Sequence, residues 1–333
     1  MKQFSDLRIV FMGTPEFAVA SLDALVQAGG NIVGVITAPD KPAGRGMKLT
    51  QSAVKQYAVE KGLHVLQPEK LKNPDFLGEL KALQADIQVV VAFRMLPELV
   101  WNMPPMGTIN LHGSLLPQYR GAAPINWAVI NGEKETGVTT FKLQHAIDTG
   151  DILLQERFPI GQDETAGEVH DRMKEIGARV LVETVKGLAA GTLTETPQVV
   201  SGELSVVSAA SSIGQSAPGS QLTTDNSLLK HAPKIFTETC KIDWTKPVDD
   251  IYNLIRGLSP YPAAFTVLQD KTMKIYRAKK EPAATVATTG EWKTDQKSFL
   301  KFAGANGYIH VTELQLEGKK KMTVEEFLRG YRF

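Results

Sequence analysis

Apolar runs of strand length alternate with helix-period segments along the first half of the chain. Three runs read as buried strands, at residues 7–12, 31–37 and 87–93. The first is followed by Gly13, Thr14 and Pro15, which predicts a helix capped by Thr14, with Pro15 in its first turn, running toward Gly29. A second helix is predicted over residues 49–62. Strands that alternate with helices in this way favour a parallel, doubly wound sheet.

The strand pattern continues and then ends in a long helix. Further strands are predicted at residues 108–111, 138–143 and 152–158. Thr165 and Glu168 have the spacing of a capping box, in which each side chain bonds the other residue's backbone N–H, so a helix should begin there and run to about Gly187. We place the first domain at residues 1–200, as an α/β, mostly parallel Rossmann-like sheet.

The composition changes after this domain. Residues 201–228 are rich in Ser, Ala, Gly, Gln and Thr and have few large apolar side chains, so they predict a linker. Residues 229–333 predict a second domain, with a helix over 248–258 and a terminal helix that begins at the capping box of Thr323 and Glu326. Its short strands are predicted at residues 263–268, 272–279, 298–302 and 307–316. Short strands in such close succession favour a small, OB-like β-barrel.

Length, cysteine content and charge narrow the class of protein. A chain of 333 residues has room for about two domains. The single cysteine, Cys240, excludes an internal disulfide framework, and no run of residues has the apolar character of a secretory signal or a membrane span. We therefore expect a cytoplasmic protein, monomeric and without a membrane partner. Residues 229–333 hold 18 Lys and Arg against 12 Asp and Glu, which suits a nucleic-acid partner but also an ordinary lysine-rich surface.

Three polar residues at predicted strand ends and turns are candidates for catalysis. Asn110 and His112 end a strand-patterned segment, and Asp148 begins an Asp-Thr-Gly turn. An amide can donate to an oxyanion, an imidazole can transfer protons, and a carboxylate can stabilise the imidazolium. These are the requirements of acyl transfer without a metal or a covalent intermediate. Residues of these types also serve as caps and turn formers, so the trio alone leaves a structural role open.

Other chemistries have weaker support. Asp151 is a rival carboxylate in the same turn, where we expect it to hydrogen-bond the backbone. The other histidines lack partners at ligand spacing, so no metal site is expected. The turn that begins at Gly13 lacks the second and third glycines of a dinucleotide-binding loop, which disfavours NAD.

The sequence around the trio resembles a known family. Residues 110–127 read Asn-Leu-His-Gly-Ser-Leu-Leu-Pro-Gln-Tyr-Arg-Gly-Ala-Ala-Pro-Ile-Asn-Trp, and residues 148–151 read Asp-Thr-Gly-Asp. This long, ordered pattern resembles the folate-dependent formyltransferase family. The resemblance implies 10-formyltetrahydrofolate as the formyl donor and the α-amino group of methionyl initiator tRNA as the acceptor. It further implies direct attack by the amine, and we expect Asn110 to donate to the oxyanion, His112 to move the proton, and Asp148 to orient His112 and stabilise its charge.

The same resemblance implies binding residues. Residues 93–97 would form one wall of the folate pocket, although the family usually has a small residue at the place of Arg94. A basic loop would contact the tRNA, with Arg45 foremost because a guanidinium pairs phosphate and stacks on bases. The C-terminal barrel would follow the acceptor arm by phosphate contacts, with residues 319–321 as its densest basic cluster. The residues implied to border the folate are Ser114, Leu115, Leu116 and Pro117, and those of the tRNA loop are Lys41, Arg45 and Lys48.

Three alternatives stay open at this point. A glycinamide ribonucleotide formyltransferase would share the trio but normally ends near the first domain, whereas this chain continues for another hundred-odd residues. A sugar-nucleotide formyltransferase shares much of the Ser-Leu-Leu-Pro string but has a less basic second domain. A non-catalytic RNA-binding protein on the same scaffold would not need the intact trio, and it would ignore 10-formyltetrahydrofolate in a titration.

Overall fold

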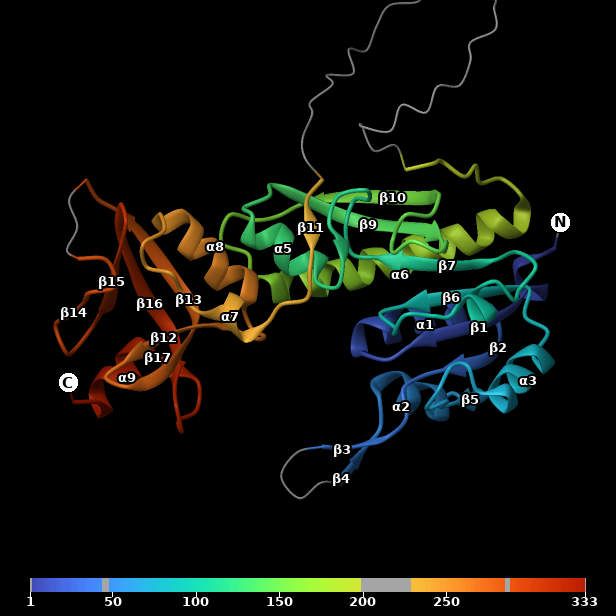
Figure 1. Cartoon of the computed structure of the whole chain (residues 1–333), viewed down its shortest axis with the longest axis horizontal. Coiled ribbons are helices and arrows are strands. Elements are labelled where there is room, and N and C mark those ends of the chain that lie inside the picture. The colour runs from blue at the N-terminus through green and yellow to red at the C-terminus, as the bar shows by residue number, and fades with distance from the viewer. Residues whose placement is uncertain (1, 44–47, 199–228, 285–287, 333) are drawn as a thin grey trace, which may run out of the picture.

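The structure is a computed structural model that describes residues 2–43, 48–198, 229–284 and 288–332. It consists of an N-terminal α/β part and a C-terminal part built on a curled antiparallel sheet, which lies at one end of the molecule (Figure 1). This is the predicted fold class. Residues 201–228, predicted as a linker, lie outside the described residues.

Within the described residues, the N-terminal part contains a seven-stranded sheet in the order β10-β9-β7-β6-β1-β2-β5. The strands from β7 to β5 run parallel, and β9 and β10 are added antiparallel at one edge. The chain extends the sheet from β1 toward β5 first and then returns to the other side of β1, so the strand order reverses between β1 and β6. Ligands of open α/β sheets bind beyond the carboxyl ends of the strands at such a point. The strands are β1 (Arg8–Gly13), β2 (Asn31–Ile36), β5 (Val65–Leu66), β6 (Ile87–Val91), β7 (Thr108–His112), β9 (Glu135–Lys142) and β10 (Ile152–Pro159).

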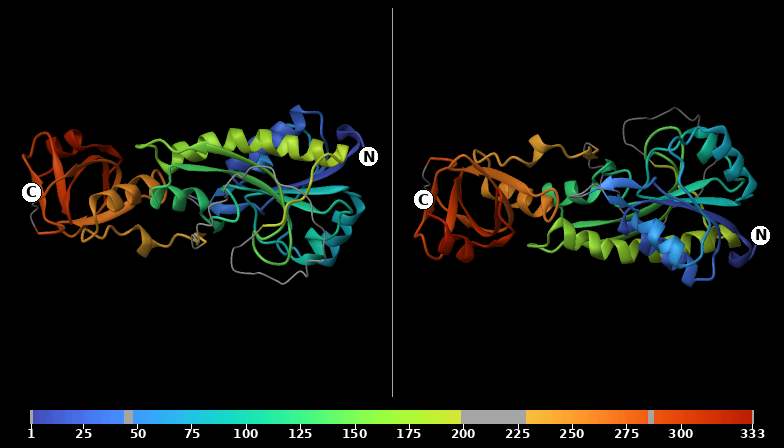
Figure 2. Two further views of the ribbon diagram at one scale, coloured as in Figure 1. Left: turned by 90° about the horizontal axis from the view of Figure 1, so that it is seen from above. Right: turned by 90° about the horizontal axis from the view of Figure 1, so that it is seen from below.

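Helices cover both faces of this sheet, as Figure 2 shows from two sides. Side chains of a strand alternate between faces, and in β1 Ile9 and Phe11 are buried against one helical layer while Val10 and Met12 are buried against the other. The first layer is formed by α1 (Glu16–Gln27), α2 (Ala53–Glu60) and α6 (Ala166–Ala190), and the second by α3 (Pro74–Ala82) and α4 (Glu98–Trp101). None of the described helices combines the length and the apolar character needed to cross a membrane.

Two predicted helix starts are wrong. The N-cap of α1 is Pro15, without a side-chain cap, so Thr14 does not cap this helix. The second helix begins at Ala53, where Ser52 Oγ accepts a hydrogen bond from the Lys55 backbone, and not at residue 49. The reason is that β4 (Lys48–Thr50) pairs with β3 (Lys41–Ala43) as a hairpin, and a local helical pattern does not reveal that pairing.

The C-terminal part confirms the predicted helix–strand order. Its sheet has the order β12-β13-β16-β15-β14, with β17 on β16, and register shifts within β13 bend it. The apolar face of α8 (Val248–Leu258) packs into the curl through Ile251, Ile255 and Leu258. The remaining elements are α7 (Thr237–Cys240), β12 (Ala264–Leu268), β13 (Lys271–Pro282), β14 (Trp292–Thr294), β15 (Leu300–Gly304), β16 (Gly307–Leu316), β17 (Met322–Thr323) and α9 (Val324–Gly330), whose capping box of Thr323 and Glu326 is present.

Hydrogen bonds join the two parts. α5 (Pro124–Ile130), which the sequence did not predict, lies against α8, and Asn126 Nδ2 donates to the Gly257 carbonyl at 2.7 Å. Tyr252 Oη donates to Asp163 at 2.6 Å, just before α6 begins. A side chain at Gly257 would collide with Ile130, since an added Cβ would lie 2.5 Å from its Cγ1. The C-terminal part is therefore docked on the end of α6 and on α5.

The predicted capping box of α6 is present, with Glu168 as its acidic member. The same side chain also contacts the C-terminal part. Burial acts to raise its pKa, but hydrogen bonds from Thr165 and from Arg277 of β13 outweigh burial and lower the pKa to about 2. A lowered folded-state pKa stabilises the fold above the unfolded value near 4.5, and this contribution is lost as the pH falls toward 2.

We predict that Glu168→Gln lowers the free energy of unfolding by about 1 kcal/mol at pH 7, the usual size of a lost cap and an exposed ion pair. The difference from wild type should shrink as the pH is lowered from 5 to 3, because the Glu168 carboxyl then becomes neutral in the unfolded chain while it stays ionised in the folded one. Urea unfolding at several pH values measures it. The control is Glu325→Gln, an exposed first-turn residue of α9. A Glu168→Gln deficit that is equal at pH 7 and 3 would exclude this carboxylate as its source.

Candidate active site

The end of β7 presents two of the candidate residues on one face of the sheet. Ile109 and Leu111 are buried in the core on the side of α1 and α6, so by alternation Asn110 and His112 point to the opposite side. His112 is buried, with a relative exposure of 6%, and Asn110 is half-buried. The alternation of side chains along β7 therefore places its core residues on one face of the sheet and its candidate catalytic residues on the other.

Both residues line a pocket of about 620 Å³ at the predicted edge of the sheet. Its walls are residues 92–96 after β6, residues 110–113 of β7 and the turn that follows, residues 121–126 at the start of α5, and residues 143–148 after β9. Asp148 belongs to the last of these segments, so the pocket brings the three candidate residues together. Among the described residues that line it, Asp148 is the single Asp or Glu and Arg94 the single Lys or Arg.

A backbone carbonyl fixes the His112 ring. The Nε2 atom lies 2.9 Å from the carbonyl oxygen of Tyr119, and because a carbonyl can only accept, Nε2 must carry a proton. In the neutral ring the unprotonated nitrogen is therefore Nδ1, which lies 3.9 Å from Asp148 Oδ2. This distance permits charge stabilisation of a protonated ring but is too long for a direct hydrogen bond.

Asp148 is held by its neighbours in turn. Its Oδ2 accepts a hydrogen bond from the Gly121 backbone at 2.9 Å, and its own backbone lies in the left-handed region with φ of 55°. Gln198 Nε2 donates to the carbonyls of Asp148 at 3.0 Å and Gly150 at 2.7 Å, and Arg120 donates to Gln198 Oε1 at 2.6 Å. Burial lowers the pKa of Arg120, and the charge of Asp148 opposes this shift.

Asn110 differs from the other two candidates. Among the described residues its side chain has no hydrogen-bond partner, so its amide is available to a ligand in the pocket. An unpaired amide beside a fixed imidazole is the arrangement that an oxyanion donor requires. Tyr119, Gly121 and Gln198, which position His112 and Asp148, were missed by the sequence reasoning. Two of them act through backbone groups, which leave no signal in residue type.

The predicted binding residues at 114–117, for folate, and in the basic loop, for tRNA, belong to segments other than the described walls of this pocket. Ser114–Pro117 are not part of the lining of the described pocket. Instead, Leu116 is bonded to Thr139 and Gln155, and Ser114 Oγ donates to the Gln118 carbonyl at 2.6 Å. Their contact with folate stays a prediction. In the hairpin of β3 and β4, Lys41 is exposed, while Arg45 and the side chain of Lys48 lie outside the described residues.

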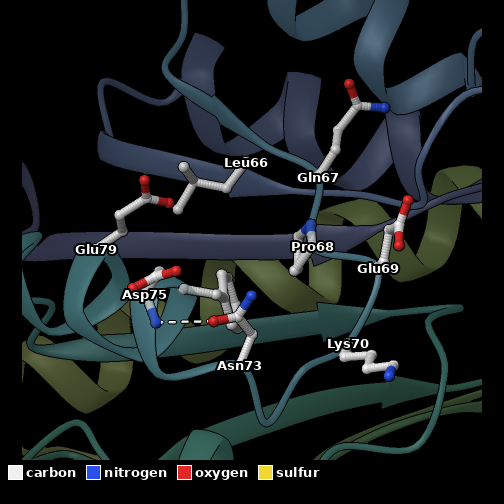
Figure 3. Close-up of a pocket in the computed structure, with 9 residues that line it drawn as sticks. Leu66, Gln67, Pro68, Glu69, Lys70, Asn73, Asp75 and Glu79 are labelled. Carbon is white, nitrogen blue, oxygen red and sulfur yellow. Dashed lines mark hydrogen bonds between the residues drawn. The ribbon is translucent and has the colours of Figure 1, made fainter.

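Arg94 lies on the pocket wall that the segment after β6 forms. Its guanidinium donates to the backbone carbonyl of Glu69 at 2.9 Å and to that of Pro68, and burial lowers its pKa. Figure 3 shows another hollow, next to this loop, with Glu69 and Lys70 on one side and Asp75 and Glu79 of α3 on the other. There Asn73 caps α3 by accepting the Asp75 backbone N–H at 2.9 Å, so the Asn73 side chain in this hollow serves the helix end.

Comparison with known proteins shows the family to which the chain belongs. Residues 7–185 match the family model described as formyl transferase, and residues 234–332 match that of the formyl transferase C-terminal domain. The methionyl-tRNA formyltransferase of Parabacteroides distasonis is 54% identical, covering 98% of this chain and 96% of that protein, and the enzyme of the same name from Flavobacterium johnsoniae is 49% identical, covering 98% and 97%.

Solved structures share the fold at low identity. WlaRD, a sugar 3N-formyl transferase in the presence of dTDP and 5-N-formyl-THF, superposes with a TM-score of 0.63 at 18% identity, covering 94% of this chain and 99% of that one. HypX from Aquifex aeolicus, in complex with tetrahydrofolic acid, gives a TM-score of 0.61 at 17% identity, covering 97% of this chain and 48% of that one. From its family models and its relatives of about 50% identity, the chain is a formyltransferase and belongs to the methionyl-tRNA formyltransferase family.

Proposed function

We propose that this enzyme transfers the formyl group of 10-formyltetrahydrofolate to the α-amino group of methionyl initiator tRNA. The observation that carries the proposal is the convergence of Asn110, His112 and Asp148 on one pocket at the switch point of the sheet. The near full-length similarity to proteins named methionyl-tRNA formyltransferase supports this acceptor, and the folates that accompany the WlaRD and HypX structures support the donor.

In the proposed reaction, the neutral amine attacks the formyl carbon directly. A new C–N bond forms while the carbonyl electrons move to oxygen, and the resulting oxyanion accepts a hydrogen bond from the Asn110 amide. The intermediate then collapses, and the bond between the formyl carbon and the folate N10 breaks with its electron pair going to N10. The proton lost by the amine ends on N10, which gives tetrahydrofolate and the formylated amine.

His112 moves this proton through Nδ1, because Nε2 is engaged by the Tyr119 carbonyl. During transfer the ring is transiently positive, and the Asp148 carboxylate at 3.9 Å stabilises that charge. The bond from Gly121 to Asp148 keeps the carboxylate in place. In this proposal Asp148 acts by its charge. The Tyr119 carbonyl orients the His112 ring, a role that the sequence analysis assigned to Asp148.

We expect Asn110→Ala to lower kcat by about 10²–10³, the usual loss for one oxyanion donor. His112→Ala should be at least as slow, and Asp148→Asn should lose rate without losing the fold. Single-turnover formylation of charged initiator tRNA measures the rates, and circular dichroism checks folding. Folded variants that each kept near-normal turnover would refute these roles.

For the donor, the position of Arg94 suggests a binding mode. Folates carry a glutamate tail, and Arg94 is the only Lys or Arg among the described pocket-lining residues. The exposed apolar side chains of Met95 and Ile147, also on the pocket lining, would flank the aromatic centre of the folate. We propose that the pterin lies toward His112 and that the tail carboxylate pairs with Arg94.

We predict that Arg94→Gln raises KM for 10-formyltetrahydrofolate about tenfold, the value of one charge-assisted hydrogen bond. KM for 10-formyltetrahydropteroate, which lacks the glutamate, should not change. Arg157→Gln, at an exposed arginine on β10 that pairs with Glu135, is the matched control. An equal loss with both donors would show that Arg94 supports the shape of the pocket and does not bind the tail.

The tRNA requires a larger surface. In the proposed division, residues 1–200 perform the chemistry, residues 229–333 hold the tRNA, and residues 201–228 join them. Lys319 and Lys320 are exposed in the turn after β16, and the nearby Lys321 pairs with Glu313 at 2.6 Å. The hairpin with Lys41, Arg45 and Lys48 would supply a second contact from the other part.

The double charge reversal of Lys319→Glu and Lys320→Glu should weaken tRNA binding on the order of tenfold and make it less sensitive to salt, because each lost phosphate contact removes about one counterion. Filter binding at several salt concentrations measures both effects. The control is Lys72→Glu with Lys81→Glu, which makes the same charge change at exposed lysines in and near α3. Equal losses in the two double variants would point to net charge and not to a binding surface.

A further inference from the structure

The turn of residues 118–123 has two hydrogen-bonded edges. One edge holds the catalytic pair, since the Tyr119 carbonyl accepts from His112 and the Gly121 N–H donates to Asp148, each at 2.9 Å. The opposite edge pairs with residues 230–233, which we call the strap. The strap includes β11 (His231–Ala232), which pairs in parallel with β8 (Arg120–Gly121) and leads from there to the C-terminal part.

The bonds between turn and strap are numerous and short. The Lys230 carbonyl accepts the Tyr119 N–H at 2.6 Å, and the Ala232 carbonyl accepts those of Ala122 at 2.7 Å and Ala123 at 3.2 Å. Side chains of the N-terminal part add two more. Gln118 Oε1 accepts the Lys230 N–H at 2.9 Å, and Trp127 Nε1 donates to the Pro233 carbonyl at 2.8 Å.

The turn holds a backbone shape that it would not adopt readily alone. Tyr119 has φ of 60°, a conformation that a non-glycine residue keeps only where the surroundings impose it, and Gly121 has φ of 125°, which glycine adopts readily. An added Cβ at Gly121 would lie 2.5 Å from the Ala232 carbonyl oxygen, so the strap packs directly against the residue whose N–H bonds Asp148. Tyr119 Oη and Lys230 Nζ both donate to Glu133, which ties the Tyr119 side chain to the strap as well.

We infer that the strap positions the catalytic pair, so that the segment entering the C-terminal part contributes to the rate of formyl transfer and not only to tRNA binding. The inference rests on the proposed function. Without the strap, the turn relaxes, the Tyr119 carbonyl and the Gly121 N–H shift, and His112 no longer presents Nδ1 in one fixed direction. The strap residues are positioning residues, because none of them lines the described pocket.

The test removes two of the side-chain hydrogen bonds to the strap, those of Gln118 and Trp127, with Gln118→Leu and Trp127→Phe. We expect kcat of the double variant to fall about tenfold, because small misplacements of catalytic groups cost up to about 10²-fold, while KM for donor and tRNA stays within about twofold. Gln118→Glu keeps an oxygen for the Lys230 N–H and should restore kcat at that position. The matched control, Tyr252→Phe, removes one hydrogen bond between the two parts away from the turn and should leave kcat unchanged.

A spectroscopic measurement separates positioning from general destabilisation. In wild type, ¹⁵N NMR should find the neutral His112 ring protonated at Nε2, and in the double variant the signals should move toward a mixture of tautomers. Unchanged tautomer and kcat, or a loss confined to KM, would overturn the inference. If the double variant does not fold, the single variants Gln118→Leu and Gln118→Glu are compared instead, by kcat and by the His112 tautomer. A wild-type enzyme without formyl transfer would instead refute the proposed function.

Discussion

The hydrogen bond between His112 Nε2 and the Tyr119 carbonyl is the constraint on which the rest of the site depends. It determines which ring nitrogen carries the proton, and therefore which one is free to act. A carboxylate at 3.9 Å can stabilise charge but cannot fix the tautomer by a direct hydrogen bond. In the proposed mechanism this backbone group orients the imidazole, and Asp148 acts through its charge.

That carbonyl can have this role because the fold brings distant segments to one place. β7 supplies Asn110 and His112, the turn after it supplies Tyr119 and Gly121, and the loop after β9 supplies Asp148. The reversal of strand order next to β6 leaves a crevice at the carboxyl ends of the strands, where these segments meet. The strap then ties the same turn to the C-terminal part, so fold, docking and chemistry share a few backbone hydrogen bonds.

The sequence alone predicts those parts of this arrangement that depend on the type of residue at each position. The apolar runs predicted the central strands, the capping boxes at Thr165 and Thr323 predicted helix starts, and the Asn110–His112 spacing predicted the residues that meet in the pocket. Prediction from the sequence failed where pairing partners are distant, as in the β3–β4 hairpin that displaced a predicted helix start. It also could not find Tyr119 and Gly121, since any residue type offers the backbone groups that they use.

The most direct test of formyl transfer to methionyl initiator tRNA follows a labelled formyl group from 10-formyltetrahydrofolate. With charged initiator tRNA, the label should appear on the methionyl amine, and one tetrahydrofolate should form for each formyl group transferred. Uncharged tRNA should give no tetrahydrofolate, because the donor reacts only with the amine. Three results would contradict direct transfer to the amine at the site of Asn110, His112 and Asp148. They are tetrahydrofolate released without an acceptor, label found on the protein, and label absent from charged initiator tRNA.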